Sequence, residues 1–419
     1  MDIVIHSLGM PFNGDTVRTK SLGGSESAAY YQARELTARG HRVKIFSTTE
    51  QDMVCDGVEY INAGNTTKDA PLGERFEYYA RHTPHDVLII QRHPIAFHNQ
   101  YASKINIWQL HDLALHRSSP MAQHGMWNID AVTTVSAWHK KQVVDVYGFH
   151  EKIVKVVPNG VDPELYAGYG IEADQVDEMI VGHPSQFNML YQARPERGLE
   201  NLVKPGGIMD LLGDTETQLL VCGYDNTVPQ MRAFYDKLKR DGEALGNVKF
   251  LGALTKPQLA ALQQRVDLMI YPTEFEEVSC ISVMEAMHAG LPVLASAVGA
   301  LPETCMNAGV KFINQRTGGV DPKAFADVVK SLMNDPYKEL NILKKKQLAA
   351  APYKTWVKAV DKLEAVINEA FEKRRGSLSA QVRHSIEHSD IGFATYLYDH
   401  TSEAELNKID LSSEREINN

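Results

Sequence analysis

Short apolar runs alternate along the chain with longer segments whose apolar residues recur at helical spacing. The runs are bounded by Gly, Pro and polar residues, as buried strands are. They predict strands over residues 2–7, 40–47, 87–91, 105–108, 131–135, 189–192, 219–222, 249–251, 268–271 and 292–295. The helical spacing predicts helices over about 25–39, 136–146, 279–289 and 353–373. Because strands and helices alternate, we expect an α/β fold with doubly wound parallel sheets.

The alternation occurs twice, which predicts two domains of the same class. The first is expected over residues 1–165 and the second over 185–350, with a Gly-rich, acidic and aperiodic linker at 166–184. The segment 353–373 predicts a long amphipathic helix with Trp356 on its apolar side. Residues 376–419 are polar, with eight acidic and three basic side chains. This tail is expected either to form a small helix pair or to be partly disordered.

Composition weighs against several classes of protein. The net charge of −10 weighs against a sequence-independent grip on nucleic acid, so a nucleic-acid partner is not expected. The four cysteines are scattered without a CxxC pair, which favours free thiols in a reducing compartment. The N-terminus predicts a first strand and no signal peptide, and no apolar stretch is long enough for a membrane span. Together these features predict a cytoplasmic location.

The segment from Tyr271 to Pro292, YPTEFEEVSCISVMEAMHAGLP, is the richest in candidate chemistry. It consists of the end of a buried strand, a loop with three carboxylates and a helix that begins near Ser279 and stops before Gly290. The small Ser279 side chain leaves the free N–H groups at the helix start accessible. Those groups and the helix dipole attract an anion, typically phosphate.

Two glutamates flank that helix start at a spacing that limits their joint chemistry. Glu277 and Glu285 are eight residues apart, or roughly 12 Å along a helix. Glycoside hydrolysis needs its two carboxylates closer together, so the pair is poorly placed to act on one bond. The spacing instead suits the two ends of a nucleotide-sugar, with phosphate between them. From spacing alone, a solvated loop and a surface helix residue explain the two glutamates equally well.

Three further positions are candidate ligand sites. Gly23 and Gly24 follow the first strand and open the first helix, so their backbone can approach a phosphate or a sugar; an ordinary tight turn is the alternative. His111 follows the strand 105–108, at the edge where open α/β sheets bind ligands; a structural histidine is the alternative. Arg194 and Arg197 stand on the turn after the strand 189–192, where their forked side chains suit phosphate oxygens; surface charge is the alternative.

In this order, the motifs resemble those of the retaining GT-B glycosyltransferases of family 4. The resemblance covers about residues 1–373 and rests on GGSE, HD at a strand end, VPNGVD, RPERG and two glutamates separated by seven residues, the second beginning EAMHAGLPVLAS. It implies two Rossmann-like domains that face each other across a cleft. It also implies that the helix 353–373 crosses back onto the first domain.

The resemblance also assigns roles to residues. Arg194 and Arg197 would neutralise the donor diphosphate, and Arg197 stands where the family more often has lysine. Glu277 would contact the hydroxyls of the transferred sugar, Glu285 the nucleotide ribose, and His111 would face the sugar. The remaining implied donor contacts are the backbone of Ser279, Cys280 and Ile281 at the distal phosphate, Gly23 and Gly24 from the first domain, and Gly252 to Leu254 at the base. Val278, Ser279 and Cys280 replace the family's usual Gly-Phe-Gly, which leaves a backbone role intact and the sugar fit open.

The implied activity is that of a retaining hexosyl- or pentosyltransferase, in which His111, Glu277, Arg194 and Arg197 form the catalytic set. The donor would be UDP- or GDP-linked, and the acceptor would be a hydroxyl of a glycan, a lipid-linked sugar or a small molecule, with a modified nucleobase also among the possibilities. No Asp-x-Asp occurs, so neither a metal nor another cofactor is expected. The acceptor would be recognised by first-domain loops, notably 11–20 and 116–128.

Two other functions fit the same resemblance. A nucleotide-sugar epimerase shares the fold and the donor, and would change the donor sugar without an acceptor. A catalytically silent nucleotide-sugar-binding scaffold would need only part of the site. The presence of Arg194, Arg197, Glu277 and Glu285 together argues against the scaffold.

Overall fold

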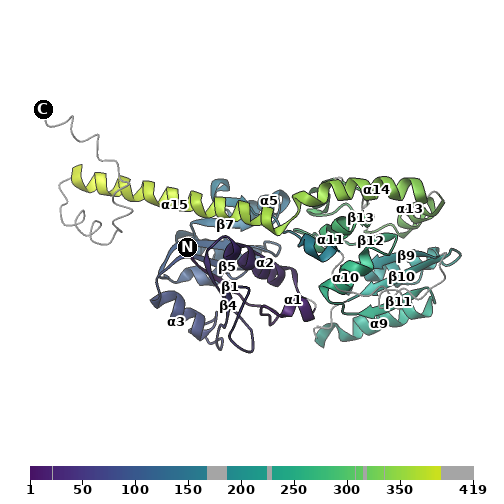
Figure 1. The fold of residues 1–419 in the computed structure, drawn as a ribbon, viewed down its shortest axis with the longest axis horizontal. Coiled ribbons are helices and arrows are strands. Elements are labelled where there is room, and N and C mark those ends of the chain that lie inside the picture. Colours follow the sequence, from purple (N-terminus) through teal and green to yellow (C-terminus); the bar gives the residue numbers. More distant parts are fainter. Residues whose placement is uncertain are drawn as a thin grey trace. The chain divides into compact units, whose positions relative to one another are not determined.

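The computed structural model describes residues 1–20, 22–167, 186–223, 229–306, 308–314, 319–334 and 336–387. The chain divides into two compact units, 1–362 and 363–419. The first unit holds both predicted sheets, each flanked by helices (Figure 1). Most of the predicted linker and all residues after 387 lie outside the described residues.

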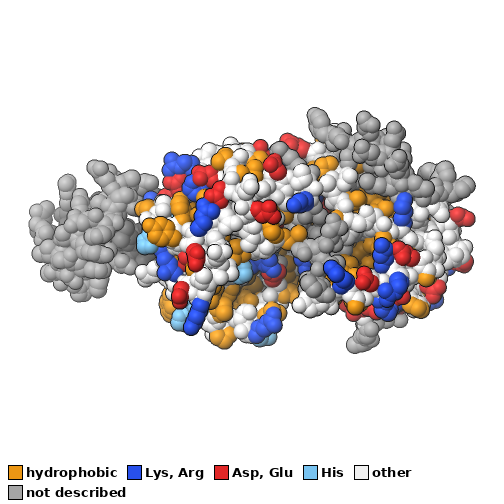
Figure 2. Space-filling view, turned by 90° about the horizontal axis from the view of Figure 1, so that it is seen from below, with side chains coloured by type: hydrophobic (Ala, Val, Ile, Leu, Met, Phe, Trp, Pro, Cys, Tyr) orange, Lys and Arg blue, Asp and Glu red, His pale blue; other side chains and the backbone are white. Residues whose placement is uncertain are grey.

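The surface carries charges of both signs. On the face shown in Figure 2, Lys and Arg side chains are interspersed with Asp and Glu, and neither sign gathers into one broad patch. None of the described helices is both long enough and apolar enough to cross a membrane.

The first sheet has eight strands in the order β3-β4-β2-β1-β5-β6-β7-β8, and only β3 runs antiparallel to its neighbour. Its strands are β1 (Asp2–Ser7), β2 (Arg42–Ser47), β3 (Met53–Cys55), β4 (Val58–Asn62), β5 (His85–Gln91), β6 (Ser103–Gln109), β7 (Ala131–Thr134) and β8 (Val154–Val156). Its helices are α1 (Thr16–Thr19), α2 (Gly24–Ala38), α3 (Glu74–His82), α4 (Ser119–Gly125) and α5 (Ala137–Tyr147). β1 is buried on both faces, which explains the unbroken apolar run at Ile3, Val4 and Ile5. The strand order reverses between β1 and β5, where such sheets bind ligands.

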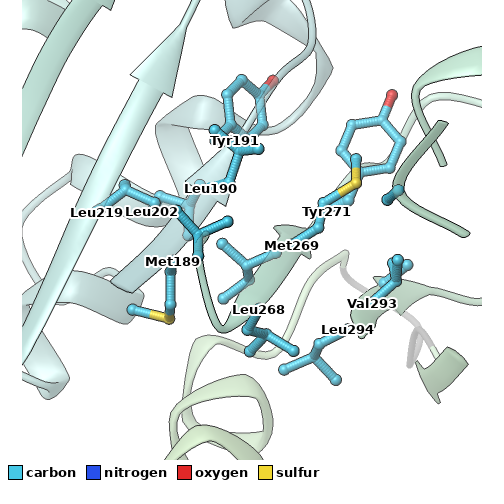
Figure 3. Packing of buried hydrophobic residues seen from close by; sticks show 14 of the residues in the cluster. Met189, Leu190, Tyr191, Leu202, Leu219, Leu268, Met269, Tyr271, Val293 and Leu294 are labelled. Atoms are coloured by element: carbon cyan, nitrogen blue, oxygen red, sulfur yellow. The ribbon is translucent and has the colours of Figure 1, made fainter. Parts of the chain in front are cut away.

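The second sheet has six parallel strands in the order β11-β10-β9-β12-β13-β14. Its strands are β9 (Phe187–Tyr191), β10 (Thr217–Cys222), β11 (Val248–Gly252), β12 (Leu268–Tyr271), β13 (Val293–Ser296) and β14 (Val310–Ile313). Its helices are α7 (Leu199–Val203), α8 (Ile208–Leu211), α9 (Arg232–Ala244), α10 (Lys256–Gln263), α11 (Ile281–Ala289), α12 (Leu301–Cys305), α13 (Pro322–Asn334) and α14 (Pro336–Ala350). Side chains of the central strands β9 and β12 form the middle of its core, with Tyr191 and Tyr271 at their carboxyl ends (Figure 3). The switch point lies between these two strands.

Short 3-10 turns join many of these elements. They span Pro94–His98, His116–Ser118, Met126–Asn128, Glu151–Ile153, Pro163–Tyr166, Pro195–Arg197, Pro229–Met231 and Ala351–Tyr353.

The chain returns to the first sheet through α15 (Trp356–Glu387). Val161 and Thr355, one from each passage between the two sheets, form a parallel bridge. The Trp356 ring then stacks on Tyr31 of α2, with the ring centroids 5.4 Å apart. The start of the helix therefore reaches the first domain, as expected. The helix extends beyond its expected end at 373, to Glu387, so residues 376–387 of the polar tail are helical.

Candidate active site

A cleft of about 550 Å³ lies where the carboxyl ends of the two sheets meet within the first unit. The first sheet supplies Gly23, Gly24, Ser25, Glu26, Arg92, His111, Asp112, Leu113, Leu115 and Asn159. The second supplies Ala193, Arg194, Arg197, Tyr271, Phe275, Glu277, Val278, Ser279, Cys280, Ile281 and Ser282. Both sets follow strands at or near the switch points, which is where this topology places ligand-binding loops.

The cleft brings together most of the residues predicted from the sequence. They are Gly23, Gly24, His111, Arg194, Arg197, Glu277, Ser279, Cys280 and Ile281. Leu254 and Glu285 line a smaller recess that shares Ser282 with the cleft. Gly252 lines neither space. Gly252 is exposed to solvent, and its carbonyl accepts a hydrogen bond from the Gly223 N–H at 3.0 Å.

Glu277 is held by two donors. The Arg197 Nη1 atom donates to Oε1 at 2.7 Å, and the Tyr271 hydroxyl donates to the same oxygen at 2.5 Å. Arg197 also lies 4.0 Å from the centre of the Phe275 ring. Burial lowers the pKa of the Arg197 guanidinium, but the combined effects of Glu277, Tyr271 and Cys280 raise it overall. Because both donors engage Oε1, the other carboxylate oxygen of Glu277 is available to a ligand in the cleft.

The start of α11 is open to an anion. The helix begins at Ile281 and not at Ser279, and its N-cap Cys280 makes no side-chain hydrogen bond to the first turn. The Ser279 hydroxyl is buried and has no hydrogen-bond partner. The first-turn N–H groups and this hydroxyl therefore provide unused donors at the edge of the cleft. Cys280 is no candidate nucleophile, because burial raises the pKa of its thiol.

His111 is neutral in the folded protein. Burial lowers its pKa to about 4. Its Nε2 atom lies 3.3 Å from the Gln91 amide nitrogen, and the Gln91 carbonyl oxygen accepts a hydrogen bond from the Ser7 hydroxyl at 2.6 Å. The fixed amide can donate only to an unprotonated Nε2, which places the His111 proton on Nδ1. The ring is thus a positioned, uncharged polar group in the cleft wall.

Glu285 forms an ion pair with Lys256, which the sequence analysis missed. Glu285 is 4% exposed, and the pair lines the smaller recess with Leu254. Lys256 stands in the first turn of α10, directly after Thr255, which begins a capping box with Gln258. That capping pattern is visible in the sequence and identifies a helix start at the base pocket. The partner of the lysine is visible only in three dimensions.

Glu26 and Arg92 were also missed. Glu26 is 4% exposed, and its carboxylate lies between Gly9 and Gly23. A Cβ on Gly23 would lie 2.3 Å from Glu26 Oε2, so this glycine makes room for the carboxylate of its own helix. A Cβ on Gly24 would lie 3.6 Å from Ile281 Cδ1, so Gly24 is the residue at which the first domain comes close to the start of α11.

Among the residues that the structure describes, no three or more His, Cys, Asp or Glu side chains are grouped as metal ligands. The expected independence of metal stays a prediction.

Comparison with known proteins relates both halves of the chain to one group. The family model described as glycosyl transferases group 1 matches residues 172–349, and that of glycosyltransferase family 4 matches residues 22–165. D-inositol 3-phosphate glycosyltransferase 1 of Catenulispora acidiphila is 29% identical over 255 residues, or 59% of each chain. Glycogen synthase of Mycobacterium tuberculosis is 23% identical over 211 residues, which cover 49% of this chain and 46% of the synthase. The chain therefore spans less than two thirds of the length of these relatives.

Solved structures match over more of the chain. Sucrose-phosphate synthase from Thermosynechococcus elongatus superposes with a TM-score of 0.70 at 16% identity, over 89% of this chain and 99% of that one. Anabaena HepE in complex with UDP-glucose superposes with a TM-score of 0.66 at 18% identity, over 89% of this chain and 100% of HepE. At these identities the likeness shows a shared fold of two Rossmann-like domains.

Proposed function

Because the chain belongs to the GT-B glycosyltransferases of family 4 type, we propose that it transfers a sugar from a nucleotide-sugar to an acceptor hydroxyl and retains the anomeric configuration. The observation that carries the proposal is the uncapped start of α11, which opens into the cleft between Glu277 and Glu285. A sugar, a diphosphate and a nucleoside can lie along this line in that order.

The departing nucleoside diphosphate requires positive potential. Arg194 and Arg197 line the cleft beside the start of α11, whose N–H groups point their partial positive charge at the same space. The Ser279 hydroxyl adds an unused donor there. These groups are fixed before the reaction, so they stabilise charge on the leaving phosphate without reorganising.

Glu277 serves in this mechanism to position the sugar. Its Oε1 is engaged by Arg197 and Tyr271, which leaves Oε2 to accept hydrogen bonds from sugar hydroxyls. Neutral His111 faces the same space from the first domain and can donate from Nδ1. At the other end, Glu285 can accept from ribose hydroxyls, while Lys256 balances its charge in the recess.

The identity of the donor and the location belong to the same proposal. HepE was solved with UDP-glucose, which supports a UDP-linked donor here; a GDP-linked donor is the alternative. All four cysteines are free thiols, which supports the cytoplasm as the place of action. We propose that the reaction needs no metal or other cofactor, because the arginines and the start of α11 can supply the positive potential for the diphosphate.

A nucleotide-sugar binding screen tests the donor site. We expect one of the UDP-, GDP-, ADP-, CMP- or dTDP-linked sugars to raise the melting temperature, with or without magnesium, because it binds only the folded protein. Glu285→Ala should weaken that binding by about tenfold or more, because it removes a charged hydrogen-bond acceptor from the ribose. Calorimetry gives the two dissociation constants.

The matched control is Glu243→Ala, which removes an exposed carboxylate from α9 and should bind the donor as the wild type does. Equal donor binding by Glu285→Ala and the wild type would refute the assigned ribose contact. If no nucleotide-sugar binds, the proposed transfer is refuted and the chain shares only the scaffold of the fold with the glycosyltransferases. Conversion of the bound sugar without any acceptor would identify an epimerase.

A further inference from the structure

A carboxylate of the chain itself, that of Glu26, lies beside the start of α2. Glu26 Oε1 accepts the Met10 N–H at 3.1 Å, and Oε2 accepts the Ser25 hydroxyl at 3.0 Å. The carboxylate is packed so closely that a Cβ on Gly9 would lie 2.1 Å from Oε1. A phosphate that approached the start of α2 would therefore meet a fixed negative charge.

The second charged feature of the first-domain wall is a preformed ion pair. Arg92 Nε donates to Asp112 Oδ2 at 2.5 Å, and both residues line the cleft. Arg92 has a φ of 71°, a left-handed conformation that costs a non-glycine residue about 1–3 kcal/mol. Its backbone N–H is bonded to the Gln109 carbonyl at 3.0 Å, which helps to hold it there. The pair presents donors and acceptors to the cleft but no net charge.

The formal charges of the residues that line the cleft sum to zero before any ligand enters. Its described lining contains three arginines, three carboxylates and no lysine: Arg92, Arg194, Arg197, Glu26, Asp112 and Glu277. A donor diphosphate adds negative charge to this balanced set and uses the arginines of the second domain. An anionic acceptor would then bring further negative charge to a wall whose single arginine is paired and whose helix start lies beside the Glu26 carboxylate.

We propose that the acceptor is an uncharged polyhydroxy compound, a sugar or polyol without phosphate or carboxylate, and that Glu26 and the Arg92–Asp112 pair bind its hydroxyl groups. The inference rests on the proposed function, because it assumes that the donor diphosphate lies at the start of α11. It sets this chain apart from the D-inositol 3-phosphate glycosyltransferase of Catenulispora acidiphila, because the inositol in that name carries a phosphate.

The test uses the full chain saturated with the nucleoside diphosphate found in the donor screen, so that the start of α11 is filled. Inorganic phosphate is then titrated in by calorimetry. We expect a dissociation constant weaker than about 5 mM. Tighter binding would overturn the inference, because it would reveal an open anion site beside the donor.

Two variants test whether Glu26 is the residue that weakens phosphate binding. Glu26→Gln is close in shape and removes the negative charge, so it should bind phosphate at least about tenfold more tightly than the wild type. Glu276→Gln, which neutralises an exposed carboxylate outside the cleft lining, should bind phosphate as the wild type does. If the Glu26 variant gains no affinity, Glu26 does not exclude anions. If it does not fold, the wild-type titration decides.

A transfer assay completes the test with matched pairs of acceptors: glucose and glucose 6-phosphate, glycerol and glycerol 3-phosphate, inositol and inositol 3-phosphate. Any pair that is used should show at least about tenfold higher kcat/KM for the uncharged member. Preference for a phosphorylated member would overturn the inference while leaving sugar transfer intact. Failure to bind any nucleotide would instead overturn the proposed function and this inference with it.

Discussion

Buried histidines lie behind the cleft wall and make the protein sensitive to acid. The His139 side chain is satisfied without a charge: Nδ1 lies 3.5 Å from the Val135 N–H, and Nε2 lies 2.9 Å from the Asp112 carbonyl. Burial lowers the pKa of His139 to about 4, as it does that of His111. Each ring therefore stays neutral in the folded state at a pH where the unfolded chain binds a proton.

The free energy of unfolding should fall as the pH is lowered from 7 to 5. Between the unfolded pKa near 6.5 and the folded value near 4, the unfolded state binds more protons, so acid favours it. Each such histidine contributes a slope of up to about 1.4 kcal/mol per pH unit. Urea denaturation at several pH values measures that slope. His139→Gln should reduce the slope by the contribution of one proton. An unchanged slope would show that His139 does not take up a proton on unfolding.

At the residue scale, the sequence predicted the members of the cleft better than their partners. Glu277 and Arg197 were each identified from local context, but nothing local showed that they bind each other across eighty residues. Glu26 is part of the very motif that was singled out for its glycines. Its burial depends on the backbone of Met10, which belongs to another loop. Such contacts are set by the tertiary fold.

At the scale of elements, one helix is capped by a carboxylate from the other domain. Glu303 of α12 accepts the Ala137 N–H at 2.7 Å and the Trp138 N–H at 2.9 Å, one with each oxygen. The Ser136 hydroxyl accepts the next N–H, that of His139, at 3.0 Å. The free N–H groups at the start of α5 are thus shared between its own N-cap and the second domain.

Glu303→Ala should destabilise the protein by about 1 kcal/mol, the usual loss when a helix start loses its capping acceptor. Chemical denaturation at neutral pH measures the change. Lys239→Ala on α9 is the control, because its ion pair with Glu243 is 3.8 Å long and exposed, and it should change stability by less than about 0.5 kcal/mol. Equal effects of the two substitutions would show that the cap contributes nothing.

The predictability of elements followed their burial. Strands buried on both faces, such as β1 and β12, were predicted from their apolar runs. The strands β3, β4 and β14 were missed, because short or partly exposed strands lack a continuous apolar run. The end of α15 was placed too early because the helix continues into a polar segment, where hydrophobic periodicity gives no signal.

At the scale of the whole molecule, an aromatic stack contributes to the return of the chain to the first domain. Trp356 is 5% exposed and stacks on Tyr31 with an interplanar angle of 10°. Trp356→Ala should lower the free energy of unfolding by about 3–5 kcal/mol, through lost burial and the cavity left behind. Val357→Ala, at a side chain that is 46% exposed, is the control with little expected effect. Similar denaturation midpoints for the two variants would refute the importance of the stack.

The fold class was predicted from the sequence, because strand–helix alternation and connection handedness leave few alternatives. The facing of the two sheets across a cleft was predicted from the family resemblance. The family models that match both halves confirm the family resemblance. The acceptor was not predicted, because the first-domain wall is built from single residues after separate strands, such as Arg92 and Asp112. The residues around Arg92 and Asp112 in the sequence share no pattern that would have predicted an acceptor site.

The late return of α15 has a consequence for synthesis of the chain on the ribosome. Arg39 on α2 donates to the Val357 carbonyl, 318 residues further along the chain. At about 5–20 residues per second, α2 waits roughly 15–60 s for this partner to be made. The second sheet is translated as one continuous stretch within that interval and can fold before α15 is made. Throughout it the Tyr31 ring lacks its stacking partner, so the nascent first domain leaves the face of this ring uncovered until Trp356 is made.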